Sequence, residues 1–179
     1  MAKKQKKSVG LEGLADAIRS ISMQKEEAVF NAFASVTPDS VPANLMDFAT
    51  DMAFYSLIHS AKHLIRTEWE ILYASAHDLK KNKARWLMEA VEHKKIFARQ
   101  YDVLLKKFGE EKFVAGWKKA RDTENGCSRA NLDNSEGMIY CYIIPEMNPD
   151  GTHEVLKKED GPWGQIEKKL KKKHNQGPA

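Results

Sequence analysis

The chain of 179 residues has little that would cross-link it or carry it across a membrane. Its two cysteines, Cys127 and Cys141, form no CxxC pair, which argues against a cysteine zinc site. We expect two free thiols in a reducing cytoplasm; a disulfide between them is the alternative, since they can bracket a loop. The longest uncharged apolar-rich stretch, residues 52–61, is too short to span a bilayer. No apolar segment follows the N-terminal lysines, so no secretory signal is predicted.

Catalytic signatures are also missing. The sequence contains no glycine-rich phosphate loop and no Ser, His and Asp at the spacing of a known triad. We therefore expect a non-enzymatic protein that needs no cofactor. The chain is long enough for one domain to bury a substantial hydrophobic core.

Charged residues are abundant, and charges of one sign are grouped into blocks along the chain. The net charge of +4 does not reveal these blocks. Residues 1–10 and 157–179 each carry +4, and residues 78–121 carry +7. Residues 11–77 carry −5, and residues 122–156 carry −6. A basic strip between acidic blocks can hold a phosphate backbone while the acidic remainder resists indiscriminate binding.

The hydrophobic pattern predicts a mainly α fold, a bundle of about four helices with a small β-hairpin and a basic C-terminal helix. Two prolines end the first helix, and Gly109 follows the third, as expected just past a helix C-terminus. The polar segment 78–82 is expected to connect the second and third helices as antiparallel neighbours. Apolar residues at three- and four-residue steps place the helices at 11–35, 43–77, 83–108 and 110–121.

After the predicted helices, from residue 123 onward, the composition shifts to turn-forming and β-forming residues. Turn-forming residues 123–137 predict a loop, and the hairpin is expected over 138–156 around the Asn148–Gly151 turn. Residues 163–173 predict a short basic helix. The expected organisation is a disordered basic arm (1–10), a helical bundle domain (11–122), a loop and hairpin appendage (123–160), and a basic C-terminal helix and tail (161–179).

The third predicted helix carries the main candidate site. Its apolar stripe, which includes Leu87 and Val91, is expected in the core, and a basic row lies opposite. A basic helix with an aromatic residue beside it is typical of a backbone-binding surface, although Trp86 can instead pack on another helix. The candidate nucleic-acid-binding residues on this helix are Lys83, Arg85, Trp86, Lys94, Lys95, Arg99 and Lys106.

The second predicted helix offers a further polar row. Lys62, His63 and Arg66 follow one another at helical steps and would supply phosphate contacts, unless the row is an ordinary solvated face.

The same helix carries a weak metal candidate. His59 and His63 are four residues apart, as a metal pair on one helix face requires, and Glu89 and His93 can reach them from an antiparallel neighbour. A zinc-protease helix needs Glu directly after the first His, and this chain has Ser60 there. We therefore expect ordinary helix-surface residues rather than a metal site.

Three functions remain open. The first is a non-enzymatic subunit or adaptor that binds an RNA or DNA backbone with low sequence specificity in a nucleoprotein assembly, with other protein subunits as partners and no membrane. The second is a protein-binding regulator or inhibitor of phage or mobile-element type, acting through its acidic surfaces. The third is a metal-dependent helical enzyme. No motif identifies a family; in architecture alone the chain is similar to small helical subunits of RNA-guided complexes and to small phage proteins.

Overall fold

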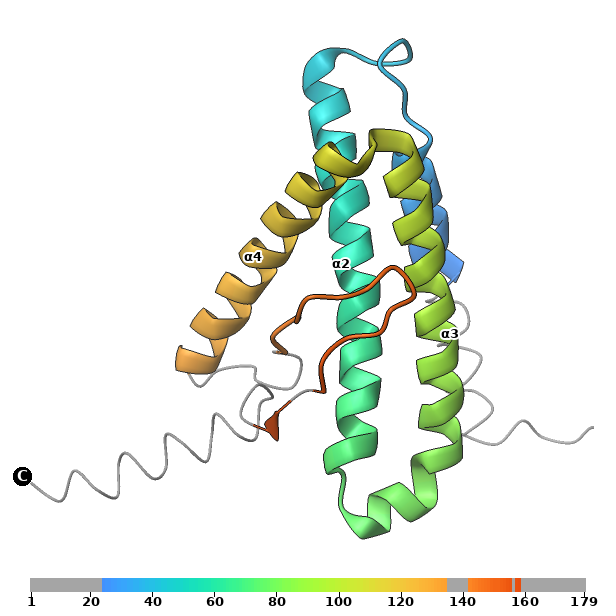
Figure 1. Ribbon diagram of the computed structural model, residues 1–179, viewed down its shortest axis with the longest axis vertical. Coiled ribbons are helices and arrows are strands. Elements are labelled where there is room, and N and C mark those ends of the chain that lie inside the picture. Colours follow the sequence, from blue (N-terminus) through green and yellow to red (C-terminus); the bar gives the residue numbers. More distant parts are fainter. Residues whose placement is uncertain (1–23, 135–141, 156, 159–179) are drawn as a thin grey trace, which may run out of the picture.

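The computed structural model describes residues 24–134, 142–155 and 157–158, and most of them are helical (Figure 1). A helical segment over 24–34 is followed by α2 (Ala43–Tyr73), α3 (Ala76–Phe108) and α4 (Glu110–Asn134). The predicted mainly α fold and helical bundle are confirmed. Within this described part, no helix combines the length and the apolar character needed to cross a membrane.

The long helix α2 is the centre of the bundle. It lies antiparallel beside α3, α4 crosses it at an angle, and the 24–34 segment packs near the upper half of α3 (Figure 1). The wide apolar face of α2 therefore meets several neighbours, and its Leu57, Leu64 and Ile65 are fully buried. Each such side chain contributes about 1.5–3 kcal/mol by leaving water. This packing fixes the polar side chains that α2 carries between the apolar ones.

The turn between α2 and α3 is shorter than the sequence pattern suggests. The expected connection 78–82 is wrong, because α3 begins at Ala76 and includes all of these residues. Ser75 caps the helix: its hydroxyl accepts a hydrogen bond from the Asp78 amide at 3.1 Å. This Ser-x-x-Asp pattern satisfies a helix-end donor that would otherwise lack a partner. The C-terminus agrees with the prediction, since α3 ends at Phe108 and Gly109 has a φ of 75°.

The apolar stripe predicted for α3 is only partly buried. Phe97 and Leu104 lie in the core, as expected, but Leu87 and Val91 are 46% and 53% exposed. Figure 1 shows the reason: α4 leaves α3 at Gly109 and descends on the other side of α2, so it does not cover the first half of α3. Near the middle of α3, His93 faces α2, where its ring stacks on His63.

Helix α4 continues well beyond its predicted end at residue 121. The loop expected over 123–137 is helical through Asn134. Asn125 and Ser128 are buried there, and the Asn125 side chain donates to the Ile144 carbonyl at 3.0 Å and accepts from the Ile144 amide at 2.8 Å. These contacts outweigh the low helix propensity of the turn-forming residues.

The predicted β-hairpin is not present as a pair of strands in the described residues. Residues 142–146 have no regular secondary structure, and an isolated antiparallel bridge joins Met147 to His153. The Asn148–Gly151 turn does form: the Gly151 amide donates to the Asn148 carbonyl, and Gly151 adopts a φ of 81°, which glycine tolerates. The expected strand residues 138–141, the N-terminal arm and the 163–173 helix lie outside the described residues.

Candidate functional site

The predicted basic row on α3 is largely neutralised by carboxylates of this chain. Lys95 Nζ lies 2.9 Å from Glu92, and Lys106 Nζ lies 2.7 Å from Asp102. Arg99 pairs with Glu27 of the 24–34 segment. A cation that already has a carboxylate partner is a weaker phosphate ligand, because the partner repels the phosphate.

The basic residues predicted on α2 do not form one surface with the basic row on α3. Lys62 bonds to Glu124 of α4, and His63 faces the 24–34 segment. Arg66 is half-buried close to His63. Lys94 of α3 lies against Gly151 and lines a pocket of about 320 Å³ with His153. These residues hold elements of the fold together instead of forming one phosphate-binding surface.

The first turns of α3 present a basic group that includes one predicted residue, Lys83, and two lysines outside the predicted set, Lys80 and Lys81. Lys80, Lys81 and Lys83 are exposed and make no ion pair with any residue that the structure describes. Arg85 Nε lies 3.7 Å from Glu89 Oε1, and Trp86 is half-buried beside them. The cations available to a partner on α3 are therefore concentrated near its N-terminus.

An apolar patch follows these lysines on the outside of α3. Leu87 and Val91 are about half exposed, and Met88 is 72% exposed. An exposed apolar group rimmed by charged side chains is typical of an interaction surface. The sequence pattern missed it because residues at the core spacing are expected to be buried.

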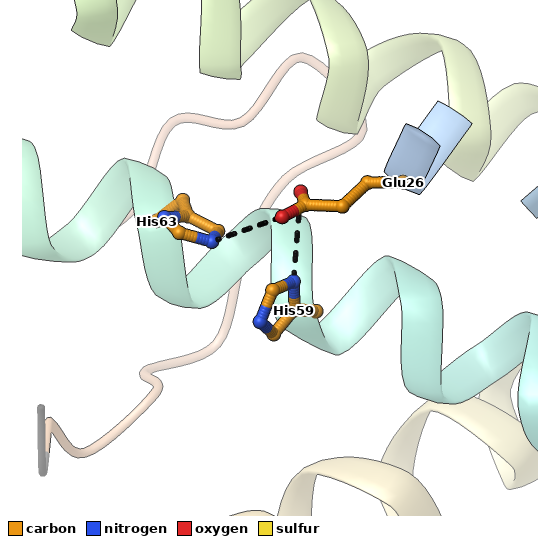
Figure 2. Close-up of side chains that lie close together, drawn as sticks. All are labelled: Glu26, His59 and His63. Carbon is orange, nitrogen blue, oxygen red and sulfur yellow. Dashed lines mark ion pairs between the residues drawn. The ribbon is translucent and has the colours of Figure 1, made fainter. Parts of the chain in front are cut away.

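A cluster of histidines and carboxylates lies where the 24–34 segment meets α2 (Figure 2). His59 Nδ1 is 3.6 Å from one carboxylate oxygen of Glu26, and His63 Nε2 is 3.7 Å from the other. One ligand atom from each of the three residues lies within 4.8 Å of the other two. The sequence pattern identified both histidines but missed Glu26, whose segment reaches them only through tertiary packing.

The other two weak metal candidates, His93 and Glu89, differ in their contacts: His93 lies against the cluster, and Glu89 pairs with a cation. The His93 ring stacks on His63 with 5.1 Å between ring centroids and an interplanar angle of 15°. Glu89 lies one helical turn before His93 and pairs with Arg85. In the structure α3 brings His93 beside His63, whereas the three converging ligand atoms come from Glu26, His59 and His63.

The pKa values of His63, His93 and Glu26 are all lowered in this cluster. Burial is the main cause that lowers the pKa of His63 to about 4, with further lowering by the charge of His59. Burial also lowers the pKa of His93, against the opposing effect of Glu89. The contact with His59, helped by the other two histidines, holds the pKa of Glu26 below its usual value. Neutral imidazoles beside an ionised carboxylate are the forms that bind a metal ion.

A pocket opens beside Glu26 and His59. It has a volume of about 300 Å³, and Val29, Met52 and Tyr55 contribute much of its lining. A small molecule bound there would lie next to two of the three converging side chains.

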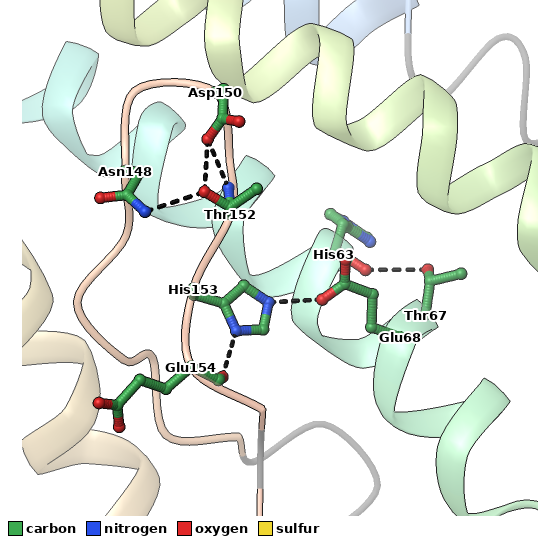
Figure 3. A network of polar contacts seen from close by, with 8 residues as sticks. All are labelled: His63, Thr67, Glu68, Asn148, Asp150, Thr152, His153 and Glu154. Atoms are coloured by element: carbon green, nitrogen blue, oxygen red, sulfur yellow. Dashed lines mark hydrogen bonds and ion pairs between the residues drawn. The ribbon is translucent and has the colours of Figure 1, made fainter.

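His153 forms a second polar centre, on the turn that docks against α2 (Figure 3). Its Nε2 bonds to the Glu68 carboxylate, and its Nδ1 lies 2.6 Å from the Glu154 carbonyl oxygen. Asp150 accepts from the Thr152 amide and hydroxyl at 2.9 and 2.7 Å, which fixes the turn. The bond to Glu68 is the main cause that raises the pKa of His153. This centre anchors the segment after α4 to α2.

A comparison with known protein families, curated proteins and solved structures finds no match for the chain. Function is therefore inferred from its own residues.

Proposed function

We propose that this chain is a non-enzymatic helical adaptor that binds a nucleic-acid backbone, and that its contact surface is the N-terminal end of α3. The observation that supports the proposal is the group formed by Lys80, Lys81 and Lys83. These side chains are exposed and have no carboxylate partner in the described residues, so their charge is available to phosphates.

Lysine contacts position a protein on a phosphate backbone but carry little sequence information. Low sequence specificity and strong salt dependence follow from such a surface, because each phosphate contact releases counterions. Trp86, half-buried beside the group, offers an edge against which an unpaired base can stack. The lysine-rich ends of the chain, residues 1–10 and 157–179, add positive charge to the same partner.

A pair of matched triple variants tests which cations matter. Charge reversal of the α3 group, Lys80→Glu with Lys81→Glu and Lys83→Glu, should weaken binding of a labelled oligonucleotide about tenfold or more. The matched variant reverses three exposed lysines that are ion-paired in the fold: Lys95, Lys106 and Lys119.

Both variants change the net charge by the same amount, so the comparison isolates position from total charge. We expect the matched variant to bind within about threefold of the wild type. Equal losses in the two variants would show that overall charge, and not this surface, governs binding. Circular dichroism of both variants checks that the helices remain folded.

The exposed apolar patch favours a second candidate function, a protein-binding regulator. The acidic surfaces considered for this role are partly used within the fold, since Glu27, Glu68 and Glu124 each pair with a cation of this chain. Leu87, Met88 and Val91 form a better contact, because they are apolar, exposed and close to unpaired lysines.

Native purification after nuclease treatment separates this candidate from the first. A protein partner that survives nuclease, and is lost when the three apolar residues are changed to Ser, would support the regulator. The control is Val114→Ser, which changes an apolar residue of similar exposure on α4. Loss of every associated molecule on nuclease treatment would leave only the nucleic-acid proposal.

A further inference from the structure

Glu26, His59 and His63 form the strongest cluster that the adaptor function does not use. The two histidines lie one turn apart on α2, and the carboxylate reaches them from the 24–34 segment (Figure 2). From these positions we infer that the three side chains form a binding site for one divalent transition-metal ion of the zinc class.

The spacing of the donor atoms carries this inference. The carboxylate oxygens of Glu26 lie 3.6 and 3.7 Å from the histidine nitrogens, which is too long for a hydrogen bond. Two ligands of a tetrahedral zinc ion with bonds of about 2.0–2.1 Å are about 3.3 Å apart. The three ligand atoms all lie within 4.8 Å of one another, so side-chain rotations that bring them closer together would let them share one ion.

The donor types select the class of metal. Two imidazoles with one carboxylate suit zinc and its first-row neighbours, whereas Mg²⁺ and Ca²⁺ prefer sites made of oxygen ligands. Three protein ligands leave a coordination position for water or a small molecule. The pocket of about 300 Å³ begins at Glu26 and His59, so a ligand in it can take that position.

His93 is a positioning residue for the site. Its ring stacks on His63 and restricts how that imidazole can turn. Glu26 lies on a different helical segment from the two histidines. A bound ion therefore joins the 24–34 segment to α2, and metal binding should raise the stability of the folded chain.

Titration of untagged, chelator-treated full-length protein tests the site. We expect one Zn²⁺ per chain by calorimetry, a visible absorption band with Co²⁺, and a rise in Tm with Zn²⁺ but not with Mg²⁺. Glu26→Gln, which keeps the shape of the side chain, should weaken Zn²⁺ binding about tenfold or more. His63→Asn should do the same and remove the Co²⁺ band.

The matched control is His77→Asn, because His77 is an exposed histidine near the start of α3 and outside the cluster. It should bind Zn²⁺ like the wild type. Circular dichroism of the metal-free variants excludes unfolding as the cause of lost binding, and His59→Gln provides a second ligand test if His63→Asn does not fold. Absence of stoichiometric Zn²⁺ binding, or wild-type affinity in Glu26→Gln, would overturn the site and would leave the nucleic-acid proposal untouched.

Discussion

Two half-buried histidines, His63 and His153, have pKa values that are shifted in opposite directions. In the cluster of Figure 2, burial dominates and keeps His63 neutral, with a pKa of about 4. At the turn of Figure 3, the Glu68 carboxylate dominates and favours the charged form of His153. Histidine is therefore a neutral side chain that can donate an electron pair to a metal ion at His63, and a cation that anchors a turn at His153.

The anchor gives the fold a pH dependence with a defined sign. The folded-state pKa of His153 is raised, mainly by Glu68 and against burial and the charge of Lys94. Its stabilisation is therefore full below its unfolded pKa of about 6.5 and is lost as pH rises through the higher folded value. We expect the free energy of unfolding to fall between about pH 6 and pH 8.5 more steeply in the wild type than in Glu68→Gln. Urea denaturation at both pH values measures this; identical pH dependence in the two proteins would refute it.

At the scale of elements, α4 approaches α2 very closely at one glycine. Gly116 lies so near the Phe54 ring that a Cβ at this position would overlap it. Farther along the same helix, a Cβ at Gly126 would meet no neighbouring atom within 4 Å. The two glycines of α4 therefore have different roles.

Alanine substitution should separate these roles. Gly116→Ala should destabilise the protein by about 1–3 kcal/mol, because the buried Phe54 ring must move. Gly126→Ala should stabilise it by up to about 1 kcal/mol through higher helix propensity. Equilibrium urea denaturation of both variants gives the comparison. A neutral or stabilising Gly116→Ala would mean that α4 does not pack this closely on α2.

The start of α3 supplies a second element-scale prediction. Ser75→Ala should lower the free energy of unfolding by about 1 kcal/mol, because the Asp78 amide loses its side-chain acceptor. Ser75→Asn, which can also cap a helix, should recover most of the loss. The same denaturation experiment measures both; if the two variants are equally unstable, Ser75 does not act as a cap.

The sequence pattern predicts the presence of the helices better than the residues at which they begin and end. Apolar periodicity located α2 and the later part of α3, and Gly109 marked the end of α3, because local backbone and burial preferences agree there. The start of α3 differs from the prediction because the polar residues 78–82 are typical of a loop, whereas Ser75 caps a helix that includes them. Helix 123–134 was missed for a physical reason: its stability comes from tertiary contacts such as the bond between Asn125 and Ile144.

At the scale of the whole molecule, the candidate sites also show that the sequence reveals local features but not tertiary contacts. The pairing of His59 with His63 was visible in the sequence because both lie on one helix. Glu26 was not visible, since only the packing of a separate helical segment brings it there. Likewise, the sequence shows the basic charge of α3 but not that Glu27, from the same segment, neutralises Arg99. The effective basic surface is therefore smaller than composition suggests and is centred on Lys80, Lys81 and Lys83.

Whether that surface binds a phosphate backbone is the central question, and the salt dependence of binding is the most direct measurement. Fluorescence anisotropy with a labelled oligonucleotide should show a slope of log K against log salt of about −2 or steeper, since three lysines each displace counterions. Between about 50 and about 200 mM salt the affinity should then fall at least about fifteenfold. Undetectable binding at low salt, or an affinity that does not change with salt, would contradict the proposed function.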